Sequence, residues 1–259
     1  MLGKSWWAGF KARHPTLTLQ IAEGLDKDRA LTLRPIIVVS FYETLSKAYT
    51  ANPYGPFQIQ NYDEIRVMAS KNGAMRVLPR RGSHNVSYII SKSWEWITIL
   101  CCMNTSGKSI PGFYLFKGKK HLQNYITKCE LSACIATQKD AWMIKELFLN
   151  WLHHFVRSIP GVVSPTNRNL LIFDSHDNHV AMTTIQEARM LGIDFLTLSA
   201  HTSHKLQPLD VSVFSPLKTY FKTERSTWLE RFPNVEIRRE ELAEIGSKSL
   251  KKALLACLA

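Results

Sequence analysis

The chain begins with apolar residues spaced three or four apart, the interval that places side chains on one face of a helix. Aromatic residues lie at this spacing after Ser5, and the pattern ends at Pro15. A second stretch of the same kind follows Pro35, a residue that the first turn of a helix tolerates. We therefore predict a helical region over residues 1–50, followed by a turn-rich linker at residues 51–56.

Beyond the linker the apolar residues form short runs that are separated by turn residues, a pattern typical of strands. Such runs predict strands at residues 57–65, 76–78, 94–103 and 110–116. Pro79 ends the second run, and the turn Asn104-Thr105-Ser106-Gly107 ends the third. Several short strands joined by turns indicate an antiparallel meander.

Helical and strand patterns alternate in the rest of the chain. Helices are predicted at residues 140–159, 180–191 and 211–232, the last with a break near Pro216, and strands at residues 170–173 and 194–198. The run at 170–173 is continuously apolar, as in strands that are buried on both faces. Trp142 and Trp151 lie on the apolar side of the first of these helices, so we expect both in the core.

This order predicts an α/β domain with a mixed sheet that is flanked by helices. We place the domain at residues 57–232, after the helical region at 1–50 and before a basic helical tail at 233–259.

The net charge of the chain indicates which class of partner it binds. The 259 residues carry a formal net charge of +12, which favours an anionic partner, with nucleic acid ahead of a membrane surface. No apolar run approaches the roughly 18 residues that a membrane span requires, and the first residues lack the pattern of a secretory signal, so we expect no membrane partner. The five cysteines lack the spacing of a disulfide framework or a zinc site, which favours reduced thiols in the nucleus or cytoplasm.

Three aspartates stand where acids rarely serve packing. Asp63 lies near the end of the first predicted strand, Asp174 follows the strand at 170–173 directly, and Asp210 opens the last predicted helix. A carboxylate at the tip of a buried strand costs desolvation unless it is paired or binds a cation. For Asp210, favourable interaction with the exposed amides of the helix start is an equal alternative. Together the three suit two hard divalent cations, which activate the attacking oxygen and stabilise the leaving oxygen in phosphodiester displacement.

Three segments carry a family resemblance. They are Asn61-Tyr62-Asp63-Glu64, Leu171 to Val180 (LIFDSHDNHV) and His201 to Lys218, which contains HTSH-x-LQPLD-V-x-VF-x-PLK and is the most specific of the three. They resemble the DDE superfamily endonucleases, and within these the pogo, Tigger and Jerky group that includes relatives of centromere protein B. The resemblance covers roughly residues 57–225.

The resemblance implies a ribonuclease-H-like catalytic domain that cleaves DNA and transfers strands as a transposase. It implies that Asp63, Asp174 and Asp210 hold two Mg²⁺ or Mn²⁺ ions. DNA is the implied partner, a second copy of the chain in a transposition complex is a further one, and the nucleus is the implied location. Glu64 points to the opposite face of its strand from Asp63, so we do not expect both at one metal.

Six basic residues are candidates for contacts with nucleic acid. They are Lys117, Lys119, Lys120, His201, His204 and Lys205. A solvated turn is the alternative for the three lysines near 118, and a zinc site is a weaker alternative for the His-x-x-His pairs at 176–179 and 201–204.

The sequence departs from the family pattern at three places. Ser175 replaces a glycine that usually follows the second aspartate, and Ile65-Arg66 replace the Thr-Gly that often follows the first motif. Residues 5–30 resemble the tail of the family's N-terminal helical DNA-binding module, so we interpret residues 1–50 as a remnant of it. The family usually has far more sequence before this point, so we expect a truncated copy or an incomplete gene model. Two other functions stay open: a domesticated or decayed copy that only binds DNA or a protein, and a ribonuclease-H-like hydrolase that acts on RNA.

Overall fold

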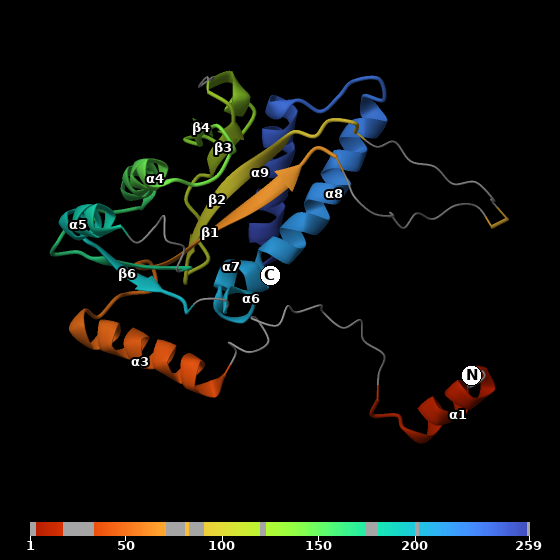
Figure 1. The fold of residues 1–259 in the computed structure, drawn as a ribbon, viewed down its shortest axis with the longest axis horizontal. Coiled ribbons are helices and arrows are strands. Elements are labelled where there is room, and N and C mark those ends of the chain that lie inside the picture. Colours follow the sequence, from red (N-terminus) through yellow and green to blue (C-terminus); the bar gives the residue numbers. More distant parts are fainter. Residues whose placement is uncertain are drawn as a thin grey trace.

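The protein is described here by a computed structural model (Figure 1). It describes residues 4–17, 34–70, 81–82, 91–119, 123–174, 181–199 and 202–257. The six strands in these residues are β1 (Ile59–Met68), β2 (Trp96–Asn104), β3 (Phe113–Lys117), β4 (Cys134–Gln138), β5 (Asn169–Phe173) and β6 (Ile193–Thr197). They form one sheet in the order β4-β3-β2-β1-β5-β6.

The sheet has an antiparallel part and a parallel part. β1, β2 and β3 form an antiparallel meander, whereas β5 pairs parallel with β1, β6 with β5, and β4 with β3. The predicted α/β class with a mixed sheet is therefore confirmed. Residues 76–78, which we predicted as a strand, lie outside the described residues.

Helices cover the two faces of the sheet (Figure 1). α4 (Lys145–Ser158) and α5 (Met182–Leu191) lie on one face, and α8 (Phe214–Arg231) and α9 (Arg239–Ala256) lie on the other. The short helices α6 (Ser203–Leu206) and α7 (Pro208–Ser212) lead into α8, and the 3₁₀ helix η1 (Gln123–Ile126) follows β3. The predicted break in the last helix is present, but it lies at Val213 rather than at Pro216, which α8 accommodates in its first turn.

Each face has its own apolar core, because successive side chains of a strand point to opposite faces. Beneath α4 the core is rich in aromatic residues, among them Tyr62, Phe148, Trp151, Phe155 and Phe173. Beneath α8 and α9 it consists largely of aliphatic residues from the meander and the helices. The alternation along β1 assigns even-numbered positions to the α4 face and odd-numbered positions to the α9 face.

Helix α9 belongs to this body, which differs from the basic tail predicted for residues 233–259. Its buried face includes Leu242, Ile245 and Ala253 within the core. At Gly246 an added Cβ would lie 2.7 Å from Cδ1 of Ile99, so the absence of a side chain allows α9 to approach β2 closely.

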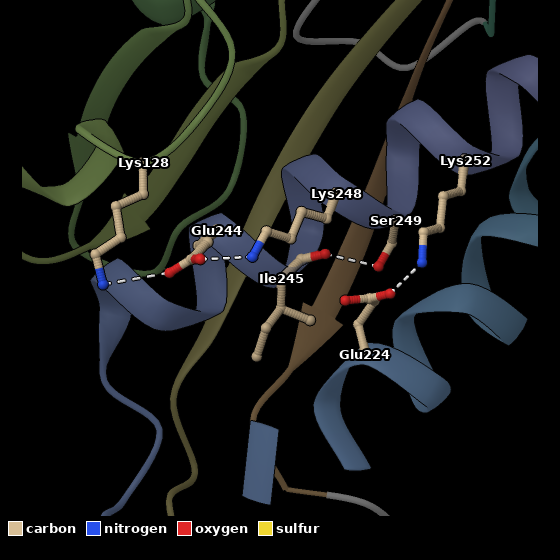
Figure 2. Close-up of polar contacts among 7 residues, drawn as sticks. All are labelled: Lys128, Glu224, Glu244, Ile245, Lys248, Ser249 and Lys252. Carbon is tan, nitrogen blue, oxygen red and sulfur yellow. Dashed lines mark hydrogen bonds and ion pairs between the residues drawn. The ribbon is translucent and has the colours of Figure 1, made fainter. Parts of the chain in front are cut away.

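Ion pairs on the outer surface tie α9 to its neighbours (Figure 2). Glu244 forms ion pairs with Lys128 at 3.3 Å and with Lys248 at 2.7 Å. Lys252 reaches back to Glu224 of α8. These side chains are partly or largely exposed, so each pair adds little stability, and the apolar core supplies most of what holds α9 in place.

Two predictions near α4 differ from the structure. Strand β4 was not predicted, because Cys134–Gln138 is short and only its middle is apolar. Trp142 precedes α4 and is 59% exposed, so the expectation of a core position was wrong, whereas Trp151 is fully buried as expected. The guanidinium carbon of Arg66 lies 4.0 Å from the Trp142 ring centroid, which is a cation–π contact.

The N-terminal helices α1 (Lys4–Arg13) and α3 (Pro35–Ala51) are present where helices were predicted. Phe41 of α3 packs against β5 and β6, whereas Ile36 is 74% exposed, so only part of the predicted apolar face is buried. None of the helices in the described residues is long and apolar enough to cross a membrane.

Candidate active site

The open edge of β1 is the centre of the candidate site. β1 pairs with β2 along almost its whole length, but with β5 only from Ile59 to Asn61. Asp63 therefore lies in the middle of its strand, not near its end as we predicted, and yet it stands just beyond the last pairing with β5. Because the pairing between β1 and β5 ends at Asn61, Asp63 has β2 but not β5 as its ladder partner.

Asp174, which follows β5 directly, lies at the same level of the sheet as Asp63 of β1. The parallel register pairs Asn61 with Ile172, and two further residues along each strand lead to Asp63 and Asp174. Two residues is one full repeat of a strand, so both acids belong to the face on which Asn61 and Ile172 lie. Neighbouring strands are about 4.8 Å apart, so this register brings the two residues together at one edge.

Asp210 comes to the same face from α7. It is the third residue of that helix, which begins at Pro208 and packs beside β1. Leu209, its neighbour, is fully buried in the core beneath α8 and α9, which anchors the turn that carries Asp210.

The electrostatics of Asp63 depend on the other two acids. Burial and then the charges of Asp210 and Asp174 raise the pKa of Asp63 well above its ordinary value. The amide of Glu64, which donates to Asp63 Oδ1 at 2.8 Å, and the side chain of Gln207 act in the opposite direction and lower that pKa. A cluster of like charges with raised pKa is an arrangement that a bound cation would stabilise.

Glu64 faces the other side of the strand. Its Oε1 accepts a hydrogen bond at 2.7 Å from the hydroxyl of Tyr62, which belongs to the core beneath α4. The strand register thus sets Asp63 and Asp174 at the same level, and the charges of Asp174 and Asp210 act on Asp63, whereas Glu64 bonds toward the other face.

Two buried amides beside the acids were not identified from the sequence. Asn61 is 7% exposed, Gln207 is fully buried, and the Asn61 Nδ2 donates to Gln207 Oε1 at 2.9 Å. A sequence signal existed for both. Each is an amide residue two or three positions before one of the three aspartates.

Four of the six residues predicted to contact nucleic acid are described. Lys117 ends β3, and its Nζ lies 4.5 Å from the Trp96 ring centroid, while Lys119 lies two residues further on. Lys205 is exposed on α6. Both ring nitrogens of His204 are buried, and in the described part of the chain they have no hydrogen-bond partner. Lys120 and His201 lie outside the described residues.

Lys117 and Lys119 line a basic cleft of about 630 Å³. Lys139 and Arg239 add positive charge to it, and Glu95 and Glu236 add negative charge, with Arg239 paired to Glu95 at 3.1 Å. Trp94, also in the lining, is 71% exposed. The cleft therefore combines cations with an exposed aromatic surface, a composition that suits nucleic acid.

No ready-made metal cluster was found among the residues that the structure describes. That part of the chain includes Asp63, Asp174 and Asp210, and no three His, Cys, Asp or Glu side chains in it, these aspartates included, are already arranged to hold an ion. All five cysteines are free thiols in the structure. The His-x-x-His pair at 176–179 lies outside the described residues.

Comparison with known proteins places this geometry in a family. The model of the DDE superfamily endonucleases matches residues 93–245, more than half of the chain. Asp174 and Asp210 fall within the matched region, whereas Asp63 precedes it, so the assignment of Asp63 depends on the strand register and the electrostatics.

Two curated relatives share part of the sequence. A protein named MFS-type transporter clz9, from Cochliobolus lunatus, is 32% identical over 170 residues, which is 64% of this chain and 18% of that protein. The pogo transposable element with KRAB domain of Homo sapiens is 25% identical over 135 residues, 51% of this chain and 21% of that protein. The matched segments thus span about a fifth of the length of these relatives.

Solved structures show the fold. The mariner Mos1 paired end complex with Mg has a TM-score of 0.54 at 12% identity, covering 97% of this chain and 69% of that one. The Mos1 transposase paired-end complex with left transposon end has a TM-score of 0.51 at 12% identity, with the same coverage. The predicted ribonuclease-H-like fold is confirmed by these neighbours.

Proposed function

The chain belongs to the DDE superfamily endonucleases, and from this premise we propose that it is a transposase-type enzyme that cleaves DNA and transfers strands with two divalent metal ions. The observation that supports the proposal is the electrostatic coupling of Asp63 to Asp174 and Asp210. They come from two strands and a helix far apart in sequence, yet the charges of Asp174 and Asp210 both act on Asp63.

The donor chemistry of the site fits Mg²⁺ or Mn²⁺. All three acids offer hard carboxylate oxygens, and the desolvation and mutual repulsion at Asp63 favour a cation over bulk water as its partner. Asp63 and Asp174 would hold the ions, and Asp210 would complete the set. When bound, such ions act as Lewis acids on the attacking and leaving oxygens of a phosphodiester.

The chain's own contribution is to present these carboxylates at an edge that a DNA strand can reach. The pairing of β5 with β1 ends at Asn61, so β5 forms no ladder with Asp63. The cleft at Lys117 and Lys119 supports DNA as the partner, because its lysines can contact phosphates and Trp94 offers a stacking surface. The net charge of +12 favours the same partner.

A nicking assay with the complete chain tests the proposal. We expect the protein with Mn²⁺ to nick supercoiled DNA, and the Asp174→Ala variant to be inactive. Nicking by Asp174→Ala at the wild-type rate would reject the site. Binding of DNA in EDTA by a chain that never nicks would favour a domesticated binding protein, and preference for an RNA–DNA hybrid over duplex DNA would favour the ribonuclease-type alternative.

The proposal extends to assembly and location. A transposition complex joins two DNA ends, so we propose that two copies of the chain act together and that they do so in the nucleus. Light scattering of the protein with and without DNA tests the first statement, and imaging of a tagged chain tests the second.

A further inference from the structure

We infer that Asn61 and Gln207 form a buried amide clamp that positions the three aspartates, and that they act as positioning residues for metal binding. This inference rests on the proposed function. The term amide clamp denotes these two side chains together with the backbone groups that they bind.

The amide clamp joins the three segments that carry the acids. Asn61 Nδ2 donates at 2.9 Å to the carbonyl of Ile172, two residues before Asp174. The same nitrogen donates at 2.9 Å to Oε1 of Gln207. Asn61 itself lies two residues before Asp63. A single side chain of β1 therefore fixes the register between β1 and β5 next to Asp63 and Asp174.

The other half of the amide clamp holds the turn that carries Asp210. The backbone N–H of Leu209 donates to Asn61 Oδ1 at 2.9 Å, and Gln207 Nε2 donates to the carbonyl of Tyr62 at 2.9 Å. Tyr62 and Leu209 are the immediate chain neighbours of Asp63 and Asp210. Each of the four hydrogen bonds therefore ends within two residues of an aspartate or joins the two amides.

Hydrogen bonds from the amide clamp to the backbone matter at this site because the like charges of the three carboxylates repel one another. Three carboxylates at one edge would move apart if the elements that carry them were free to slide. An apolar contact between β1, β5 and α7 would hold the elements together without fixing their register, since packing has no direction, whereas hydrogen bonds fix distance and angle. Both amides are buried, so breaking one bond leaves its partner unsatisfied, which makes slippage costly.

A matched control lies on the neighbouring residue. Gln60 is 2% exposed, and its Nε2 donates to the carbonyl of Phe57 at 2.7 Å. It is a buried amide of β1 like Asn61, but its side chain points to the opposite face and bonds locally, not to an element that carries an acid. Loss of Gln60 should thus affect folding without moving the aspartates.

The test compares Asn61→Leu and Gln207→Met with Gln60→Met, three near-isosteric changes that each remove one buried amide. Mn²⁺ binding is measured by calorimetry, and thermal unfolding is recorded with and without Mn²⁺. We expect both clamp variants to bind Mn²⁺ about 10- to 100-fold more weakly and to lose the Mn²⁺-induced rise in Tm. Gln60→Met should keep the wild-type affinity even if its Tm in EDTA falls as far.

Turnover and DNA affinity provide a second readout. In the nicking assay the clamp variants should lose kcat, while their Kd for DNA measured in EDTA stays at the wild-type value. If Asn61→Leu does not fold, Gln207→Met alone carries the test. Wild-type Mn²⁺ affinity in a folded clamp variant, or equal weakening in Gln60→Met, would overturn this inference and leave the proposed function intact. A wild-type chain that binds no Mn²⁺ would reject the proposed function, and this inference with it.

Discussion

The two faces of the sheet use β1 in opposite ways. Toward α4, the Tyr62 ring packs edge-on against Phe148 and Phe173 and at a tilt against Trp151, and its hydroxyl donates to Glu64. Toward α7, the next residues along the same strand are polar and partly or fully buried, with Asn61 and Asp63 beside Gln207. One strand thus supports a closed aromatic core and an acidic edge at alternate positions.

The difference separates stability from function. The α4 face buries large rings that gain free energy by leaving water. The α7 face buries amides and gathers like charges, which cost free energy in the absence of a cation. An unfavourable free energy of this kind is expected where the side chains of a site are arranged for a ligand and not for stability.

The largest effect is expected at the acidic edge. Asp63→Asn should lower DNA nicking by more than about 100-fold, since it removes a proposed metal ligand, not merely a partner of one. The same change should raise Tm in EDTA, because the raised pKa of Asp63 means that its ionised form is less stable in the folded protein than in the unfolded chain.

Asp140→Asn is the control for that experiment. Asp140 is exposed in the turn after β4, so its loss should change neither nicking nor Tm appreciably. A fall in Tm for Asp63→Asn in EDTA would contradict the view that the acidic edge is destabilising.

The second effect concerns the aromatic core. Trp151→Ala should destabilise the fold by about 3–5 kcal/mol, because the ring is fully buried and α4 cannot close over the cavity completely. Chemical denaturation measures this loss. Trp142→Ala, which removes an exposed ring before the same helix, should cost much less, and equal losses would show that exposure does not distinguish the two positions.

A third effect tests a polar cluster that serves the fold alone. Asp194 accepts two hydrogen bonds from Arg168 at 2.6 Å and one from Tyr54 at 2.7 Å. Burial raises the pKa of Asp194, but these bonds outweigh it and the pKa is lowered. A lowered pKa means that the stabilisation is present above the unfolded pKa, near 4, and is lost as pH falls through the folded value.

Asp194→Asn should therefore lower stability by about 1–2 kcal/mol at pH 7, a figure discounted because the pair is partly exposed, and the gap to wild type should narrow below about pH 4. Nicking per folded molecule should not change. A gap that stays constant from pH 7 to pH 3 would contradict the assignment of the stabilisation to the ionised carboxylate.

The smallest effect is expected in the basic cleft. Lys117→Ala should reduce the slope of log affinity for DNA against log salt by about 0.9, since one phosphate contact is lost. Lys222→Ala, an exposed lysine of α8 that does not line the cleft, should leave the slope unchanged. Equal slopes for Lys117→Ala and the wild-type chain would remove Lys117 from the DNA interface.

The prediction of elements succeeded where the pattern was long and failed where it was short. The continuous apolar run before Asp174 and the helix that Gly192 ends were both found from the sequence, and the φ of +84° at Gly192 explains why a glycine stands there. Strand β4 was missed because five residues carry too weak a periodicity. Trp142 was misplaced because its spacing continues the helical pattern of α4 beyond the start of that helix.

The sequence by itself determined the class of the fold and the identity of the acids. Alternating strand and helix patterns, and the motif around Asp210, are local properties that the chain carries before it folds. Only the tertiary structure decided that the pairing of β5 with β1 ends two residues before Asp63 and that Asn61 reaches Gln207. The physical reason is that register and facing depend on pairs of residues more than 100 positions apart, and no local pattern specifies which of them will meet.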